Sequence, residues 1–122
     1  VENMNHAIQL VSEELNISIP EFTVAGVPHD NFFAHHWYVA CNDKVDATLL
    51  AQKIDNKLKE LNDDYAVERN SALKAVFLDV LSEEQFMDFM KHKGKIGGQH
   101  KFPRVLKGKM LDDWQQYLKK EK

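Results

Sequence analysis

The hydrophobic positions at the start of the chain follow a helical period and then an extended one. Apolar residues three and four apart predict an amphipathic helix over residues 3–15, with a stripe of Met4, Ala7, Ile8, Val11 and Leu15. Pro20 stops helical continuation, and two apolar runs follow, Phe22–Val27 and Phe32–Cys41. The turn-forming residues 28–31 separate these runs, so an antiparallel hairpin is expected.

The clearest helical pattern lies in residues 47–61, where Asp46 is placed to cap the first turn. Residues 62–64 (Asn-Asp-Asp) interrupt the pattern and predict the start of a short helix. In that helix Tyr65 and Arg69 share a face, and a hydrogen bond on the helix surface is expected for them rather than a ligand. The run Leu73–Leu81 is almost continuously apolar, which predicts a central strand covered on both faces.

The remaining elements complete an α+β pattern. Ser82 and Gln85 match a capping box, and the helix that follows is expected to bury Phe86, Phe89 and Met90 and to end at Gly94. A last helix carries Leu111, Trp114 and Leu118. The order of elements predicts a small mixed sheet of about three to four strands with helices packed on it. Residues 1–122 are expected to form a single domain, and Val1 in place of an initiator Met indicates a cut from a longer chain.

Charge divides the chain in a way that its net value of −3 conceals. Residues 1–90 carry 6 basic and 16 acidic side chains, whereas residues 91–122 carry 10 basic and 3 acidic ones. Residues 91–109 hold seven Lys or Arg and no acid, and we call this stretch the basic segment. Such a segment attracts phosphate groups, although docking on the acidic part of the same chain is an alternative.

Glycines and cations gather in the basic segment. Four of the five glycines of the chain stand there, Gly94, Gly97, Gly98 and Gly108. Glycine lets backbone amides approach a ligand closely, and lysine adds charge, so the combination suits phosphate oxygens. The spacing matches neither a Walker A loop nor a dinucleotide fingerprint. A solvated basic turn therefore remains an alternative explanation.

Pro103 stiffens the basic segment, because it fixes its own φ and restricts Phe102 to an extended conformation. Lys101 and Arg104 flank this dipeptide and are expected on a rigid part of the segment. A lysine positioned in this way at a bound triphosphate stabilises the charge that develops on leaving pyrophosphate. In the alternative, Phe102 and Val105 anchor the segment and both cations point into water.

Other candidate chemistry is weaker. His35 and His36 are adjacent in a strand and face opposite sides, so they are not expected to share a metal, and no metal site is predicted. Cys41 is the only cysteine and is expected to be a small buried thiol. Four aromatic residues of the second strand are expected in the core unless one sheet face is open: Phe32, Phe33, Trp37 and Tyr38. With no membrane-spanning run and no signal peptide, a cytoplasmic protein is expected.

Three stretches, LNDDYAVERN, LSEEQFMDFM and GKIGGQHKFPRV, resemble in order and spacing the C-terminal domain of the auxin-responsive acyl acid amido synthetase family. The resemblance runs from the first helix through Val105. Its strongest parts are Asp64-Tyr65 with Arg69, and the pattern Gln99-x-Lys101-x-Pro103-Arg104.

The resemblance implies an adenylate-forming ligase, in which this chain is the lid-like C-terminal domain. ATP and a carboxylic acid would give an acyl-adenylate, and an amino acid would then take the acyl group. The N-terminal adenylation domain would bind most of the ATP, the Mg²⁺ expected with it and the acid. Lys101 would be the catalytic lysine, and its neighbours on the nucleotide would be Gly97, Gly98, Gln99, Arg104, Lys107 and Lys109. Arg104 would support either the loop or the phosphate.

Alternatives to this assignment remain open. Related enzymes often carry their mobile lysine in a Gly-Lys pair, so Lys107 or Lys109 competes with Lys101. The acceptor could be a thiol, as in acyl-CoA ligases. A stand-alone nucleic-acid-binding module is less expected, because the acidic residues 1–90 would repel a phosphate backbone. An interaction domain that docks another chain through its aromatic strand face is a further possibility.

Overall fold

A computed structural model describes residues 2–93 and 102–120 of the chain. Four strands form one sheet in the order β3-β2-β1-β4. β1 (Glu21–His29) and β2 (Phe32–Ala40) are an antiparallel hairpin, as predicted. β3 (Leu73–Leu81) runs parallel to β2, and β4 (Val105–Leu106) runs parallel to β1. The predicted small mixed sheet is therefore confirmed, and the short β4 is an addition that the pattern did not predict.

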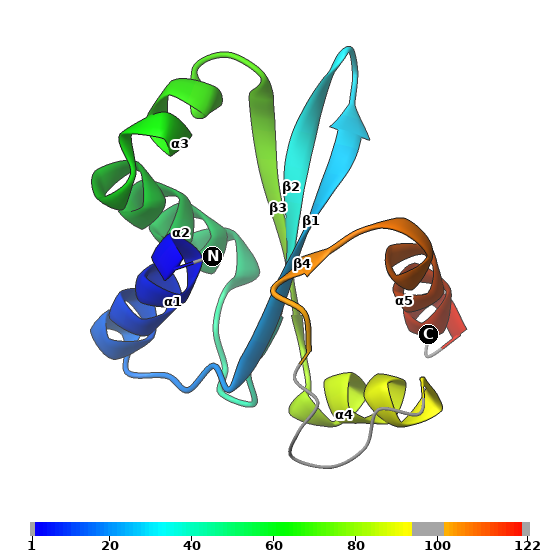
Figure 1. Cartoon of the computed structure of the whole chain (residues 1–122). Helices are drawn as coiled ribbons and strands as arrows, with labels where there is room; N and C mark the ends of the chain where they lie inside the picture. The colour runs from blue at the N-terminus through cyan, green and yellow to red at the C-terminus, as the bar shows by residue number, and fades with distance from the viewer. Residues whose placement is uncertain (1, 94–101, 121–122) are drawn as a thin grey trace.

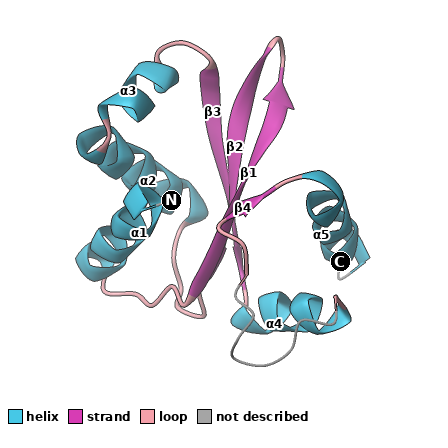
Figure 2. Ribbon diagram, viewed as in Figure 1, coloured by secondary structure: helices cyan, strands magenta, loops and turns pink. Residues whose placement is uncertain are grey.

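Helices lie on both sides of the sheet. On one side are α1 (Glu2–Leu15), α2 (Ala47–Leu61) and α3 (Asp63–Arg69), and on the other are α4 (Glu83–His92) and α5 (Gly108–Lys120) (Figure 1). Figure 2 shows the resulting layers, with the strands between the two groups of helices. The α+β architecture with helices packed on a sheet is as expected from the sequence.

Side-chain caps set the starts of three helices at the predicted places. Asp46 accepts from the backbone N–H of Thr48 and begins α2, and Asn62 accepts from the N–H of Tyr65 and begins α3. Ser82 and Gln85 form the predicted capping box at α4. Each cap satisfies a backbone donor that the helix itself leaves without a partner.

The sheet has a separate hydrophobic core on each face. Between the sheet and α1–α3 the core includes Val11, Phe22, Trp37 and Ile54, among other apolar side chains. Between the sheet and α4–α5 it is built on eight buried residues: Tyr38, Ala40, Phe86, Phe89, Met90, Phe102, Leu106 and Trp114. Alternate residues of β2 thus enter different cores, because successive side chains of a strand point to opposite faces.

The expectation of a central β3 is wrong, since β3 is an edge strand. Val76, Leu78 and Val80 pack toward the α1–α3 core, whereas Phe77 is 43% exposed. A continuous apolar run arises here because one face is buried and the other also carries apolar residues. Pattern alone does not separate this case from a strand covered on both faces.

Two further expectations need correction near the hairpin. Pro28 and His29 belong to β1, so only Asp30 and Asn31 form the turn. β1 is paired with β4 only at Val24 and Ala25, so at Pro28 the edge of β1 that faces β4 has no partner strand among the described residues. Pro28 is tolerated there because it has no backbone N–H to donate to a neighbouring strand. Of the aromatic residues of β2, Trp37 and Tyr38 are buried as expected, but Phe32 is 50% exposed.

Candidate functional site

The described part of the basic segment reaches the sheet at the β4 edge. Three of the residues expected to contact nucleotide are described there: Arg104, Lys107 and Lys109. Lys101, Gly97, Gly98 and Gln99 fall outside the described residues, so their roles stay predictions. The described site begins at Phe102, the residue directly after Lys101.

Phe102 anchors the segment in the core between the sheet and α4–α5. Its side chain is 3% exposed, and its ring centroid lies 4.8 Å from that of Phe86 and 5.1 Å from that of Trp114. The alternative explanation had both Phe102 and Val105 anchor the segment, but Val105 is 45% exposed and Leu106 is buried in its place. The chain is therefore held by packing immediately after Lys101, which supports a stiff segment at this point.

The Arg104 side chain lies on the other side of the sheet, against β1 and α1. Its guanidinium forms an ion pair with Glu21 and donates to the carbonyl oxygen of Phe22 at 3.0 Å. It also donates to Oδ1 of Asn5 at 3.1 Å and lies 4.3 Å from the centroid of the Phe22 ring. The Arg104 carbonyl oxygen accepts from the backbone N–H of Val24 at 2.9 Å.

These contacts decide which role the geometry favours for Arg104. The chain crosses the sheet edge between Phe102 and Arg104, so Arg104 is directed away from the side on which α5 and the following lysines lie. Its charge is already neutralised by Glu21. The arrangement favours the loop-supporting role over contact with a phosphate.

Replacing Arg104 should therefore weaken the domain itself. We expect Arg104→Met to lower the free energy of unfolding by about 1–2 kcal/mol, because the partly buried Glu21 loses its ion pair and the Phe22 carbonyl oxygen and Asn5 each lose a hydrogen bond. Urea unfolding followed by circular dichroism measures the change. Lys107→Met is the matched control, since Lys107 is exposed and a surface substitution usually changes stability by about 0.5 kcal/mol or less. Equal unfolding midpoints for both variants would contradict the structural role of Arg104.

Lys107 and Lys109 flank the start of α5. Gly108 has a φ of 64°, in the left-handed region that glycine adopts without strain, and so turns the chain from β4 into the helix. Lys107 is exposed, whereas Nζ of Lys109 lies 3.2 Å from Oδ2 of Asp113. Lys93 contacts the same carboxylate oxygen at 2.5 Å, and the hydrogen bonds from Lys93 and Lys109 lower the pKa of Asp113. Both predicted nucleotide contacts are therefore exposed, and Lys109 is paired with Asp113.

A second polar cluster, which the sequence did not reveal, lies between α2 and α3. Its centre is Asp55, which is 9% exposed. Oδ1 of Asp55 accepts from the hydroxyl of Tyr65 at 2.5 Å and from Nε of Arg69 at 2.9 Å. Arg69 also donates to the carbonyl oxygen of Leu73 at 2.7 Å, and Lys59 lies 3.6 Å from Oδ2 of Asp55. Tyr65 and Arg69 thus share a face, as predicted, but they converge on a buried carboxylate rather than a helix surface.

The environment of this cluster indicates a structural role. Burial and the hydrogen bond to Asp55 raise the pKa of Tyr65, so its hydroxyl keeps its proton at neutral pH. Burial, with the Arg69 charge as a smaller cause, lowers the pKa of His35, whose ring lies 6.2 Å from that of Tyr65. A neutral imidazole, a protonated phenol and a paired carboxylate are suited to joining α2, α3 and the start of β3. They are not arranged as an acid–base pair facing solvent.

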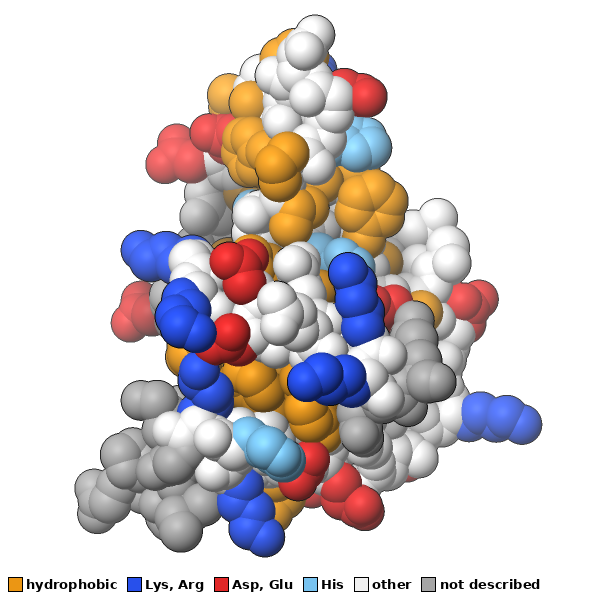
Figure 3. Space-filling model, turned by 90° about the vertical axis from the view of Figure 1, so that its right-hand side faces the viewer, with side chains coloured by type: hydrophobic (Ala, Val, Ile, Leu, Met, Phe, Trp, Pro, Cys, Tyr) orange, Lys and Arg blue, Asp and Glu red, His pale blue; other side chains and the backbone are white. Residues whose placement is uncertain are grey.

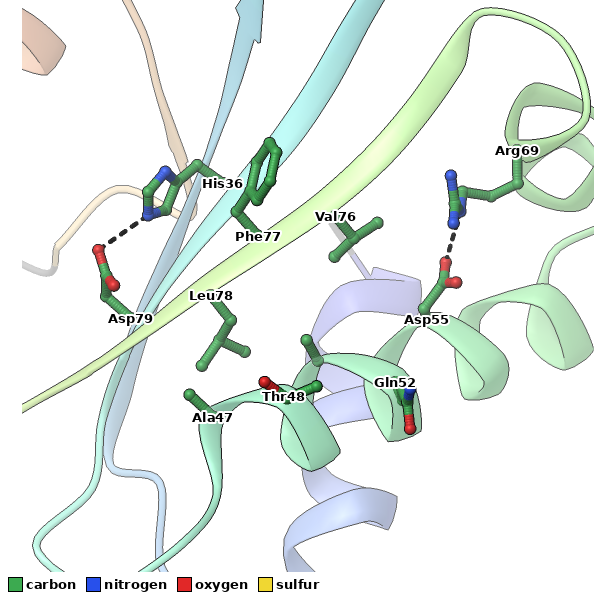
Figure 4. A pocket seen from close by; sticks show the side chains of 11 residues that line it. His36, Ala47, Thr48, Gln52, Asp55, Arg69, Val76, Phe77, Leu78 and Asp79 are labelled. Carbon is green, nitrogen blue, oxygen red and sulfur yellow. Dashed lines mark hydrogen bonds and ion pairs between the residues drawn. The ribbon is translucent and has the colours of Figure 1, made fainter. Parts of the chain in front are cut away.

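A shallow depression of about 500 Å³ lies along the free edge of β3, beside α2 (Figure 4). The pair His36–Asp79 lies at one end and the pair Asp55–Arg69 at the other, with apolar side chains of β3 between them. β3 and β4 are the two outer strands, so the depression and the basic segment lie at opposite edges of the sheet. Three strand spacings of about 4.8 Å separate them.

The other residues considered from the sequence are placed as follows. His35 and His36 point to opposite faces, as predicted, with His35 beside Tyr65 and His36 beside Tyr38. Cys41 is buried, as expected, and its Sγ lies 3.7 Å from the carbonyl oxygen of Asp43. Within residues 2–93 and 102–120, no three His, Cys, Asp or Glu side chains are grouped to hold a metal ion. None of the described helices is long and apolar enough to cross a membrane.

Comparison with known proteins identifies the family. A model of the GH3 family C-terminal domain matches residues 2–109. No curated protein matches the sequence. Among solved structures, one described as GH3.15 acyl acid amido synthetase superposes with a TM-score of 0.67 at 15% identity, covering 95% of this chain and 23% of that one.

A second solved structure gives the same result. It is described as AtGH3.15 acyl acid amido synthetase in complex with 2,4-DB, and it superposes with a TM-score of 0.71 at 15% identity. The match covers 94% of this chain and 23% of that one, so the chain spans about a quarter of the length of these proteins. At this identity the superposition shows the fold, and the family follows from the model that matches most of the sequence. The chain belongs to the GH3 family, and it is the C-terminal domain of that family.

Proposed function

We propose that this chain is the lid domain of an ATP-dependent acyl acid amido synthetase. In the first half-reaction, a carboxylate oxygen of the acid attacks the α-phosphorus of ATP, and the bond to the bridging oxygen breaks to release pyrophosphate. In the second, the nitrogen of an amino acid attacks the acyl carbon. The bond to AMP then breaks, and the amine loses a proton as the amide forms.

The observation that carries this proposal is the attachment of the basic segment to the domain. Family membership indicates a larger enzyme with an N-terminal domain, and the two similar solved structures described above are acyl acid amido synthetases. In the described residues, Phe102 is packed in the core and Arg104 is clamped to β1. The described chain that directly follows Lys101 is thus fixed to the domain at Phe102 and Arg104, which supports a positioned lysine at this point of the sequence.

The proposal assigns roles to residues of the segment. Lys101 acts as the catalytic lysine, because its ammonium group would stabilise the charge on leaving pyrophosphate. Gly97, Gly98 and Gln99 would bring backbone and amide donors to the nucleotide, and Lys107 with Lys109 would add charge beside it. Arg104 supports the segment through Glu21.

The described residues fit a phosphate-bearing substrate better than a metal ion. Lys107 is exposed, and Lys109 is 84% exposed although it contacts Asp113, so both can reach phosphate oxygens. The part of the chain that the structure describes holds no grouped metal ligands. The Mg²⁺ expected with ATP is therefore assigned to the N-terminal adenylation domain.

Pairing within the domain argues against the nucleic-acid alternative. Lys93 lies 2.5 Å from a carboxylate oxygen of Asp113, and Arg104 is paired with Glu21. Cations that are already paired release fewer counterions on binding a phosphate backbone and contribute less to affinity. This leaves a compact nucleotide substrate as the better partner for the basic segment.

Pyrophosphate exchange in the complete chain that carries this domain tests the function. We expect exchange between labelled pyrophosphate and ATP that depends on a carboxylic acid, followed by amide formation when amino acids are added. A panel of aromatic and aliphatic acids is screened first, and amino acids are then compared with coenzyme A as acceptors. Thioester formation without amide would support an acyl-CoA ligase instead. Absence of acid-dependent exchange across the panel would reject adenylate formation.

A further inference from the structure

Part of the sheet face on the α4/α5 side is not covered by any described helix. Tyr38, Ala40 and Leu81 pack with α4 and α5 at one end of that face. Toward the β1–β2 turn, the same face carries a set that we call the open face: Val27, His29, His36, Phe77 and Asp79. Figure 1 shows the hairpin projecting beyond both helices. Figure 3 views this side and shows hydrophobic and histidine side chains gathered over the projecting part.

The rings of the open face form a continuous row. The ring of His29 meets that of Phe77 edge-on at 5.7 Å, and Phe77 lies 6.2 Å from His36. His36 stacks on Tyr38 with 4.3 Å between ring centroids, and Tyr38 in turn contacts Trp114 of α5 at 5.7 Å. Nε2 of His36 lies 2.9 Å from Oδ2 of Asp79. The row is thus held in place by the core at one end, which lowers the entropy cost of binding a partner.

The exposure of this row is unusual for the position it occupies. β2 and β3 are parallel, and parallel strands are usually covered on both faces. The α1–α3 side of the same strands is covered, whereas Phe77 is 43% exposed and the His29 side chain is 37% exposed. A clustered apolar surface bordered by polar groups such as Asp79 is typical of an interaction site.

The open face borders the lysines of the proposed nucleotide contact. In the β1–β4 ladder Leu106 lies opposite Ala25. Lys107 therefore leaves the sheet beside Gly26, next to Val27 of the open face. A partner that contacts both Lys107 and the open face would therefore meet them at neighbouring positions along β1.

We infer that the open face is the surface on which the N-terminal domain of the same synthetase docks. This inference rests on the proposed function. The chain spans only 23% of the length of its structural neighbours, so the greater part of such an enzyme is available to cover the face. The matching surface must be apolar opposite Phe77 and carry a hydrogen-bond donor or cation opposite Asp79, whose side chain is 57% exposed.

Photo-crosslinking in the complete enzyme tests the docking surface. Phe77 is replaced by p-benzoylphenylalanine, which reacts only with groups in contact with it, and the linked peptides are identified by mass spectrometry. We expect a link from position 77 to a peptide of the N-terminal domain within one chain, with or without ATP. The matched control carries the same group at Val67 of α3, which is 66% exposed on the other layer and is expected to give at least 10-fold less product. The same group at His29 repeats the measurement if the Phe77 variant does not accumulate.

Each outcome decides the inference. Links within one chain from positions 77 and 29, but not 67, support it. Links between two chains would show that a second copy covers the face, and equal yields at 77 and 67 would show that the face is free. Both results overturn the inference. Crosslinking needs no turnover, so absence of pyrophosphate exchange together with a link within one chain would reject the proposed chemistry and keep the docking surface.

Discussion

Lys101→Ala in the complete synthetase is expected to slow acid-dependent pyrophosphate exchange by about 10²- to 10³-fold, the usual effect of removing one positioned group that stabilises transition-state charge. Negative charge on the departing pyrophosphate grows as its bond to the α-phosphorus breaks. A lysine that contacts this group contributes more in the transition state than in the ground state. The variant should therefore lower kcat with little change in the KM for the acid.

Control variants separate Lys101 from its neighbours. Lys107→Ala and Lys109→Ala are expected to raise the KM for ATP by a few-fold each, because the proposed function gives these lysines a place beside the nucleotide and away from the reacting bond. Lys119→Ala, at the exposed end of α5, should leave exchange unchanged. A normal exchange rate for Lys101→Ala, together with a large loss for Lys107→Ala or Lys109→Ala, would move the catalytic role to that residue.

Asp55→Ala is expected to give the largest loss of stability, about 3 kcal/mol of unfolding free energy. The Asp55 and Arg69 side chains are only 12% and 19% exposed. Removing the carboxylate therefore leaves the Arg69 guanidinium without its ion-pair partner and with little access to water. Tyr65 loses its hydrogen-bond acceptor in the same step. Chemical unfolding followed by circular dichroism measures the change.

Three further variants test whether the loss comes from the buried pair. Lys59→Ala removes only a 3.6 Å contact of a 41% exposed lysine and should cost less than about 1 kcal/mol. Tyr65→Phe removes one hydrogen bond and should cost about 1–2 kcal/mol. Adding Arg69→Met to Asp55→Ala should recover part of the stability, because the unpaired charge is gone. A double variant less stable than Asp55→Ala alone would show that Arg69 acts mainly through its bond to Leu73.

The helices and the hairpin could be predicted because their signals are local. The period of apolar residues and the caps at Asp46, Asn62 and Ser82 depend on neighbours within one turn, and the three caps are confirmed. The predicted end of α4 at Gly94 lies outside the described residues. The family followed from motifs that also lie close together in the chain. The prediction that β3 is a central strand was wrong because strand order depends on pairing between strands that are far apart in the sequence.

The candidate site was only partly predictable, for a related reason. Asp55 lies beside the apolar stripe of α2, where its burial is decided by the docking of α3. A signal was present, since a carboxylate at the border of an apolar stripe precedes a Tyr and an Arg four residues apart. Glu21 precedes Arg104 by 83 residues, and no local pattern joins them. The open face could not be predicted from the sequence either, because Phe77 lies in the apolar run 73–81, whose pattern predicts a strand buried on both faces.

The sequence by itself determined the helices, their caps, the β1–β2 hairpin, the family and the concentration of cations in residues 91–109, since each of these depends on residues close together in the chain. Only the tertiary structure decided that Arg104 is directed to Glu21, that Tyr65 and Arg69 meet at Asp55, and that one part of the sheet is left uncovered. The physical reason is that burial and ion pairing depend on which surfaces pack together. Packing depends on contacts between residues that are distant in the sequence, so no short stretch of the chain predicts it.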